Sequence, residues 1–107
     1  MYKYPKEIHL GAHTYTITLL NQCGVDDYGK NVGDCDNQKY EIRVATLCSD
    51  GKQRALSYLE ETLVHEFVHT VNEVYSCELD EKNIDRMGQG LAQILNSIGV
   101  YLVKESQ

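Results

Sequence analysis

Hydrophobic and polar residues alternate along the first half of the chain, which predicts β-strands. Thr14 to Leu20 alternates threonines with aromatic and aliphatic residues, and the shorter segment Glu7 to Leu10 precedes it. Gly11-Ala12 lies between them as a turn, so we expect a hairpin. Lys39 to Thr46 alternates in the same way, which predicts a third strand with one face toward solvent.

The segments around that third strand lack a clear period. Asn21 to Asn37 contains three glycines and four aspartates, which predicts a loop with room for a short strand. Its end, Gly33 to Asn37, has the composition of a turn. Ser49-Asp50-Gly51 then interrupts the strand pattern and offers a cap for a helix beginning in the low fifties.

From Leu56 to about Tyr75 the apolar residues recur every three or four positions, which predicts one long amphipathic helix. Asp80 can cap a second helix, whose apolar stripe runs from Ile84 to Ile98 and ends at Gly99. We therefore expect an α+β fold, with a small antiparallel sheet of about three strands followed by a two-helix hairpin. Residues 1–107 should form a single domain, with strands and loops mainly in 1–50 and the helical hairpin in 51–107.

The charge of the chain argues against nucleic acid and membrane partners. Ten basic and sixteen acidic residues give a formal net charge of −6, and no segment concentrates Lys or Arg. No apolar stretch approaches the roughly 18 residues that a membrane span needs, and the N-terminus does not resemble a signal peptide. We expect a cytoplasmic protein.

The four cysteines are Cys23, Cys35, Cys48 and Cys77. Their wide and irregular spacing favours reduced thiols over a disulfide framework. Because no Cys-x-x-Cys pair is present, we do not expect them to form a second metal site.

The run His65-Glu66-Phe67-Val68-His69 lies in the middle of the first predicted helix. Residues four apart on a helix lie about 6 Å apart along the axis and on nearly the same face, so both imidazoles can bind one cation. Glu66 is turned about 100° from His65 and can reach a water on that cation as a general base. Because Zn²⁺ activates such a water, the run predicts one zinc ion, although a chance occurrence in a helix without metal is also possible.

A catalytic zinc of this kind needs a third protein ligand, and the acidic residues downstream are the candidates. Glu73 continues the histidine row but should point past the ion, whereas Glu78 lies in the connection between the helices. Glu81 and Asp85 lie one turn apart on the second helix, and Gly88 on the same face predicts a close approach of the two helices. Helix geometry alone leaves Glu81, Asp85 and Glu78 open.

Several segments resemble small phage-type zincin-like proteins, which are distantly similar to the ImmA/IrrE metallopeptidases. The matching segments are Gly33 to Asp36 before Glu41 to Val44, then Glu61 to Thr70, and then Leu79 to Glu81 opening a helix that runs into Gly90-Leu91, so that about two thirds of the chain is covered. The resemblance implies a minimal zincin-like fold and a phage or mobile-element origin.

By the same resemblance His65, His69 and Glu81 are the zinc ligands and Glu66 is the catalytic acid/base. The expected activity is that of a zinc-dependent metallopeptidase acting on a peptide or protein. The alternative is a zinc-binding module without turnover that contacts a host or phage regulatory protein.

A peptide substrate would pair with an edge strand, for which Lys39 to Thr46 is the candidate because it directly precedes the active-site helix. A hydrogen-bond donor for the oxyanion could come from Tyr75, Tyr101 or Tyr28. The sequence does not choose among these three tyrosines.

Overall fold

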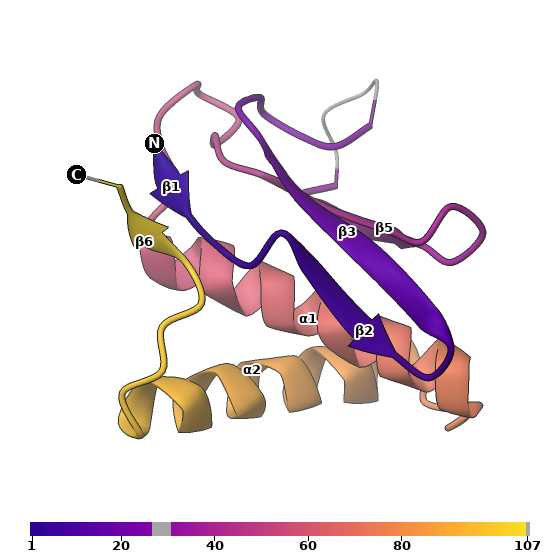
Figure 1. The fold of residues 1–107 in the computed structure, drawn as a ribbon. Helices are drawn as coiled ribbons and strands as arrows, with labels where there is room; N and C mark the ends of the chain where they lie inside the picture. Colours follow the sequence, from indigo (N-terminus) through magenta and orange to yellow (C-terminus); the bar gives the residue numbers. More distant parts are fainter. Residues whose placement is uncertain (27–30, 107) are drawn as a thin grey trace.

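The computed structural model describes residues 1–26 and 31–106 and contains a mixed sheet, a small terminal sheet and two helices (Figure 1). The elements are β1 (Tyr2–Lys3), β2 (Glu7–Leu10), β3 (His13–Leu20), β4 (Gly33–Asp36), β5 (Glu41–Ala45), α1 (Leu56–Tyr75), α2 (Glu81–Ser97) and β6 (Lys104–Glu105). The expected α+β class, with a sheet followed by a two-helix hairpin, is confirmed.

The main sheet differs from the expected antiparallel one. It has four strands in the order β2-β3-β5-β4, and β3 and β5 run parallel, while β2–β3 and β4–β5 are antiparallel hairpins. The segment Gly33–Asp36, predicted as a turn, forms the strand β4 at the edge of the sheet. Ile42 and Val44 of β5 are completely buried, and a central strand gives them neighbours on both sides.

Both helices end close to where the apolar pattern ends, but α1 begins later than expected. Ser49-Asp50-Gly51 does not cap it: these residues lie in a tight turn in which the N–H of Gly51 donates to the carbonyl of Cys48. α1 starts after Ala55 without a side-chain cap. For α2 the predicted signals are correct, because the Asp80 side chain accepts from the N–H of Asn83 (2.8 Å) and Gly99 follows the C-cap with φ of +83°.

A single core lies between the sheet and α1. Its fully buried members are Tyr15, Ile17, Ile42, Val44, Leu59, Leu63 and Val103. Val103 reaches this core because the chain returns after α2, and β6 pairs with β1, so the two ends of the described chain lie side by side (Figure 1). No helix among the described residues has the length and apolar character that crossing a membrane requires.

The second helix lies outside this core. α2 packs along α1 on the side away from the sheet, and Figure 1 shows it as the lowest layer of the molecule. Its inward residues are Ile84, Gly88 and Ala92, of which two are small. The two helices can therefore approach closely, and this approach determines the geometry of the candidate site.

Candidate metal centre

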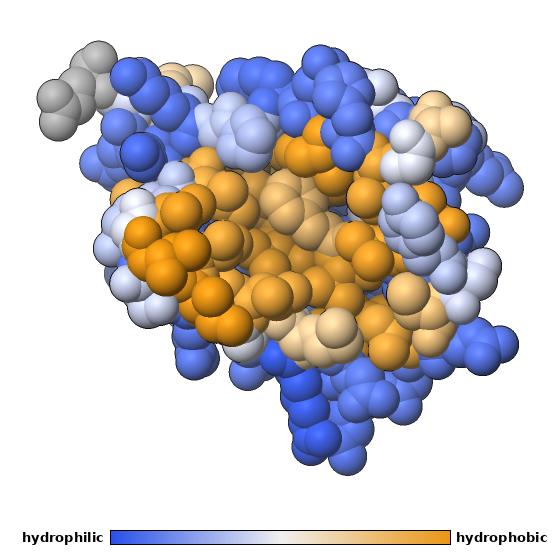
Figure 2. Space-filling model, turned by 60° about the horizontal axis from the view of Figure 1, so that its bottom comes forward, coloured by the Kyte–Doolittle hydropathy of each residue, from blue (hydrophilic) through white to orange (hydrophobic). Residues whose placement is uncertain are grey.

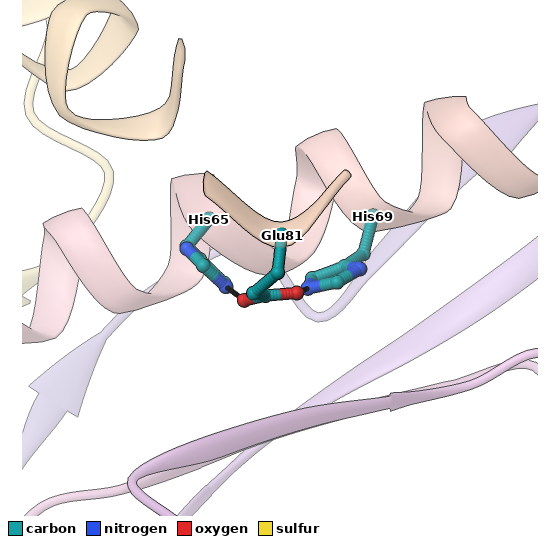
Figure 3. Close-up of side chains that lie close together, drawn as sticks. All are labelled: His65, His69 and Glu81. Carbon is teal, nitrogen blue, oxygen red and sulfur yellow. Dashed lines mark ion pairs between the residues drawn. The ribbon is translucent and has the colours of Figure 1, made fainter. Parts of the chain in front are cut away.

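Three of the predicted ligands converge between α1 and α2. The carboxylate of Glu81, the first residue of α2, lies between the two imidazoles of α1 (Figure 3). Its Oε1 is 3.0 Å from Nε2 of His65 and its Oε2 is 3.0 Å from Nε2 of His69. The ring centroids of the two histidines are 4.9 Å apart, as expected for residues one helical turn apart.

These atoms suit a tetrahedral zinc ion. One ligand atom from each of His65, His69 and Glu81 can be chosen so that all lie within 4.8 Å of one another. Zinc takes imidazole nitrogen and carboxylate oxygen at about 2.0–2.2 Å, which puts two ligands of a tetrahedral ion about 3.3 Å apart. Two imidazoles and one carboxylate are also a recurring catalytic zinc set with an open fourth position. The residues therefore fit zinc in chemistry, and the two 3.0 Å separations between Glu81 oxygens and imidazole nitrogens are close to those between ligand atoms around one ion.

Glu81 reaches the histidines because α2 lies almost against the backbone of α1. A Cβ atom added to Gly88 would lie 3.0 Å from Cα of His65, so a larger side chain would push the helices apart. The close approach predicted from Gly88 is confirmed. The Asp80 cap fixes where α2 begins, and it thereby places Glu81 in the first turn.

The other candidates for the third ligand lie elsewhere. Oδ1 of Asp85 is 3.6 Å from Nδ1 of His65, on the side of that ring away from Glu81. This is longer than a hydrogen bond, so Asp85 lies beside the imidazole but outside the convergent group. Glu78 lies in the connection between the helices with φ of +57°, and Glu73 is exposed on α1. Within the described residues neither of them belongs to the convergent group.

Glu66 lies beside this group in a buried position. Its exposed fraction is 5%, and burial raises its pKa from 4.5 to about 7, with smaller contributions from the negative charges of Asp34 and Glu81. Gly33 of β4 leaves room for the carboxylate, because a Cβ at Gly33 would be 3.2 Å from Oε2 of Glu66 and 2.6 Å from the Thr62 methyl group. A carboxyl group with a pKa near neutrality can both accept and return a proton at physiological pH.

An open cleft of about 1130 Å³ runs past the three ligands. Helix residues on one side of it include His65, Glu66 and His69, and Gly33, Asp34 and Cys35 of β4 line it as well. The expectation that Lys39 to Thr46 is the edge strand is wrong, because β5 lies between β3 and β4. The edge beside the site is β4.

The side of β4 with which no described strand pairs presents backbone groups to this cleft. Ala45 donates its N–H to the carbonyl of Val32 (2.8 Å), so Asp34 and Asp36 are the strand residues that bond to β5 in the alternating ladder. The backbone groups of Gly33 and Cys35 therefore point to the open edge. The thiol of Cys35 packs inward, 3.2 Å from the hydroxyl of Thr70, and this contact ties β4 to α1.

Of the three tyrosines considered for the oxyanion, the two that the structure describes lie outside the cleft. Tyr75 and Tyr101 are exposed and do not line it, and Tyr28 lies outside the described residues. Tyr58, in the first turn of α1, does line the cleft and was missed. Tyr58 lies seven residues, or two helical turns, before His65, and this spacing could have predicted that the two side chains share a face of the helix.

Arg54 is a second residue of the cleft that the sequence analysis missed. Its guanidinium donates to the carbonyl of Ala45 and to the hydroxyl of Thr62, both at 2.8 Å, and it thereby ties the start of α1 to the sheet. The four cysteines are free, with Cys23 and Cys35 half-buried and Cys48 and Cys77 exposed.

Comparison of the chain with protein-family models, curated proteins and solved structures gives no significant match. The resemblance to small zincin-like proteins therefore stays a prediction. The function has to be argued from the geometry of the site.

Proposed function

We propose that the protein is a zinc-dependent metallopeptidase that holds one zinc ion through His65, His69 and Glu81. The observation that carries the proposal is the convergence of these three side chains from two helices, with both carboxylate oxygens 3.0 Å from an imidazole nitrogen. Glu66, buried next to them, supplies the acid/base group. A set of two histidines, a third ligand and a neighbouring carboxyl group is what hydrolysis by an activated water requires.

A zinc ion bound there would polarise the scissile carbonyl and lower the pKa of a coordinated water toward about 7. The protein contributes the proton transfers. In the metal-free protein the pKa of Glu66 is about 7, and the positive charge of a bound zinc ion would favour the ionised carboxylate further, so Glu66 can take the proton of the attacking water. The resulting carboxylic acid can then deliver that proton to the leaving amine.

The substrate in this proposal is an extended peptide segment lying along β4. The free backbone groups of Gly33 and Cys35 can add a strand by main-chain hydrogen bonds, as in other cases of strand addition. Such pairing is independent of side-chain identity, so it would orient the peptide bond near Glu66 without defining a sequence. The cytoplasmic location and the phage or mobile-element origin stay predictions.

The decisive experiment compares zinc content and hydrolysis in the same preparations. Wild-type protein should bind one zinc per chain and cleave peptides from a panel of unfolded proteins, whereas Glu66→Gln should keep the zinc and lose cleavage by a factor of about 10² or more. Glu73→Gln is the matched control, because Glu73 is an exposed residue on the same helix and outside the ligand group.

Two results would contradict the proposal. If wild-type protein binds no zinc after reconstitution, the proposed metal centre is wrong. If the protein binds zinc but wild type and Glu66→Gln cleave equally, or neither cleaves, the proposed peptidase activity is wrong. The protein is then a zinc-binding module.

A further inference from the structure

A large apolar surface lies on the outer side of α2 and is separate from the metal centre. We define this apolar face by Met87, Leu91 and Ile94 of α2, its C-cap residue Ile98, Val71 of α1, and Val100 and Tyr101 after α2, all of which are exposed. Figure 2 shows hydrophobic surface gathered continuously across the side on which α2 lies, with hydrophilic residues around it. Asp85 and Gln89, on the other flank of α2, line the metal cleft instead.

The apolar face is larger than an isolated chain ordinarily exposes. Ile94 and Ile98 are 56% and 68% exposed, and the other five members are 39% to 53% exposed. At roughly 150–250 Å² for a large side chain, the seven together present on the order of 500–850 Å². The largest apolar patch of a typical monomer is about 300–600 Å², and a stable interface buries about 800 Å² on each partner. The apolar face with its immediate rim therefore matches one half of an ordinary interface.

The charge distribution of the chain indicates what kind of partner surface would bind the apolar face. The chain carries a formal net charge of −6, yet no charged residue occurs from Met87 to Val103. A strongly charged partner would find no complementary group within this segment. A second copy of the chain would meet an uncharged surface of its own kind, and the acidic remainder of each copy would stay at the periphery.

Gly90 gives an independent indication that a second helix packs against α2. It lies in the middle of α2, where glycine weakens a helix, and nothing lies within 4 Å of the position its Cβ would take. Gly88, by contrast, is explained by the backbone of α1. Gly90 lies one turn from both Met87 and Ile94, so the missing side chain lets a second backbone approach the apolar face along this margin.

We propose that the apolar face is an interface between two copies of this chain, in which α2 of one copy packs against α2 of the other around a two-fold axis near Gly90. Such an interface is self-complementary, so the same residues are covered on both copies. It would also complete the packing of α2, whose buried residues within one chain are only Ile84, Gly88 and Ala92. The inference does not depend on zinc or on peptidase activity.

Sedimentation equilibrium over a wide range of chain concentrations tests the interface, with a chelator present so that metal plays no part. Wild-type protein should show a concentration-dependent mass rising to two chains. Ile94→Glu should raise the dissociation constant by about thirtyfold or more, because it buries a charge in an apolar contact. Gly90→Leu should also raise it, since the new side chain fills the space for the second backbone.

Thr18→Glu is the control for added charge, because Thr18 is exposed on β3, away from the apolar face, and this variant should associate like wild type. Circular dichroism verifies that each variant is folded. A wild-type mass of one chain at every concentration would overturn the proposal, whether the face is then covered by another protein or by nothing. Association that Ile94→Glu and Gly90→Leu leave unchanged would overturn it as well.

Discussion

Replacing Glu66 by glutamine should stabilise the metal-free protein while it abolishes the proposed activity. Burial raises the pKa of Glu66 from 4.5 to about 7, so folding disfavours the ionised carboxylate. At 1.36 kcal/mol per pKa unit, this difference corresponds to about 3 kcal/mol of unfolding free energy. Glutamine has nearly the same shape and carries no charge, so it avoids this cost.

The size of this stability difference depends on pH. Below pH 4.5 the carboxyl group is protonated in both the folded and the unfolded protein, and wild type and Glu66→Gln should be equally stable. As the pH rises toward 7, the unfolded chain ionises first, so the wild type loses stability relative to the variant. Above about pH 7 the difference should be constant, with Glu66→Gln more stable by about 3 kcal/mol.

The assay is urea unfolding of chelator-treated protein at a series of pH values from 4 to 8, followed by circular dichroism. Glu73→Gln, an exposed change on the same helix, should stay within about 0.5 kcal/mol of wild type throughout. A difference between wild type and Glu66→Gln that is independent of pH, or a variant less stable than wild type at pH 8, would refute the argument that Glu66 is a buried and desolvated acid.

Four further predictions concern the zinc ligands and the second helix. Zinc at about 1,000 times its dissociation constant should stabilise wild type by about 4 kcal/mol in thermal unfolding and should have little effect on His69→Ala. In competition with a chromogenic chelator, Asp85→Asn should lower zinc affinity by about 10- to 100-fold, and Glu81→Gln should lower it further. If Asp85→Asn lowers zinc affinity more than Glu81→Gln does, Asp85 is the ligand instead. Gly88→Val should lower the unfolding free energy by about 1–3 kcal/mol and weaken zinc binding, because its Cβ would meet the backbone of α1. Gly90→Ala, where space is open, should instead stabilise the unassociated chain by up to about 1 kcal/mol in denaturant unfolding.

The helices and the two histidines were predictable because they depend on local periodicity. The apolar repeat from Leu56 and the caps at Asp80 and Gly99 lie within a few residues of the turns they define. The spacing of His65 and His69 fixes their relation on any helix, whatever surrounds it. The acid/base role proposed for Glu66 also followed from its place in that turn, although its burial did not.

The sheet was less predictable because strand order depends on segments far apart in the chain. The alternation in Lys39 to Thr46 predicted a strand correctly but could not say whether it lies at the edge or in the centre. Gly33–Asp36 is rich in turn-forming residues, yet it forms β4, because β5 offers it a hydrogen-bonded partner and Gly33 fits against Thr62. β1 pairs with β6 and so joins the two ends of the described chain, and no local sequence pattern predicts this pairing.

By itself the sequence determined an α+β protein with a histidine pair on an amphipathic helix, since helical periodicity fixes which side chains share a face. Which acidic residue lies beside the two histidines depends on how α2 packs on α1. Helix geometry left Glu78, Glu81 and Asp85 open, and the family resemblance implied Glu81. In the structure the contact of Gly88 with the backbone at His65 fixes how α2 lies on α1 and brings Glu81 between the two rings. The tertiary structure also made β4 the edge of the cleft and left one side of α2 uncovered, because both depend on how separate elements pack.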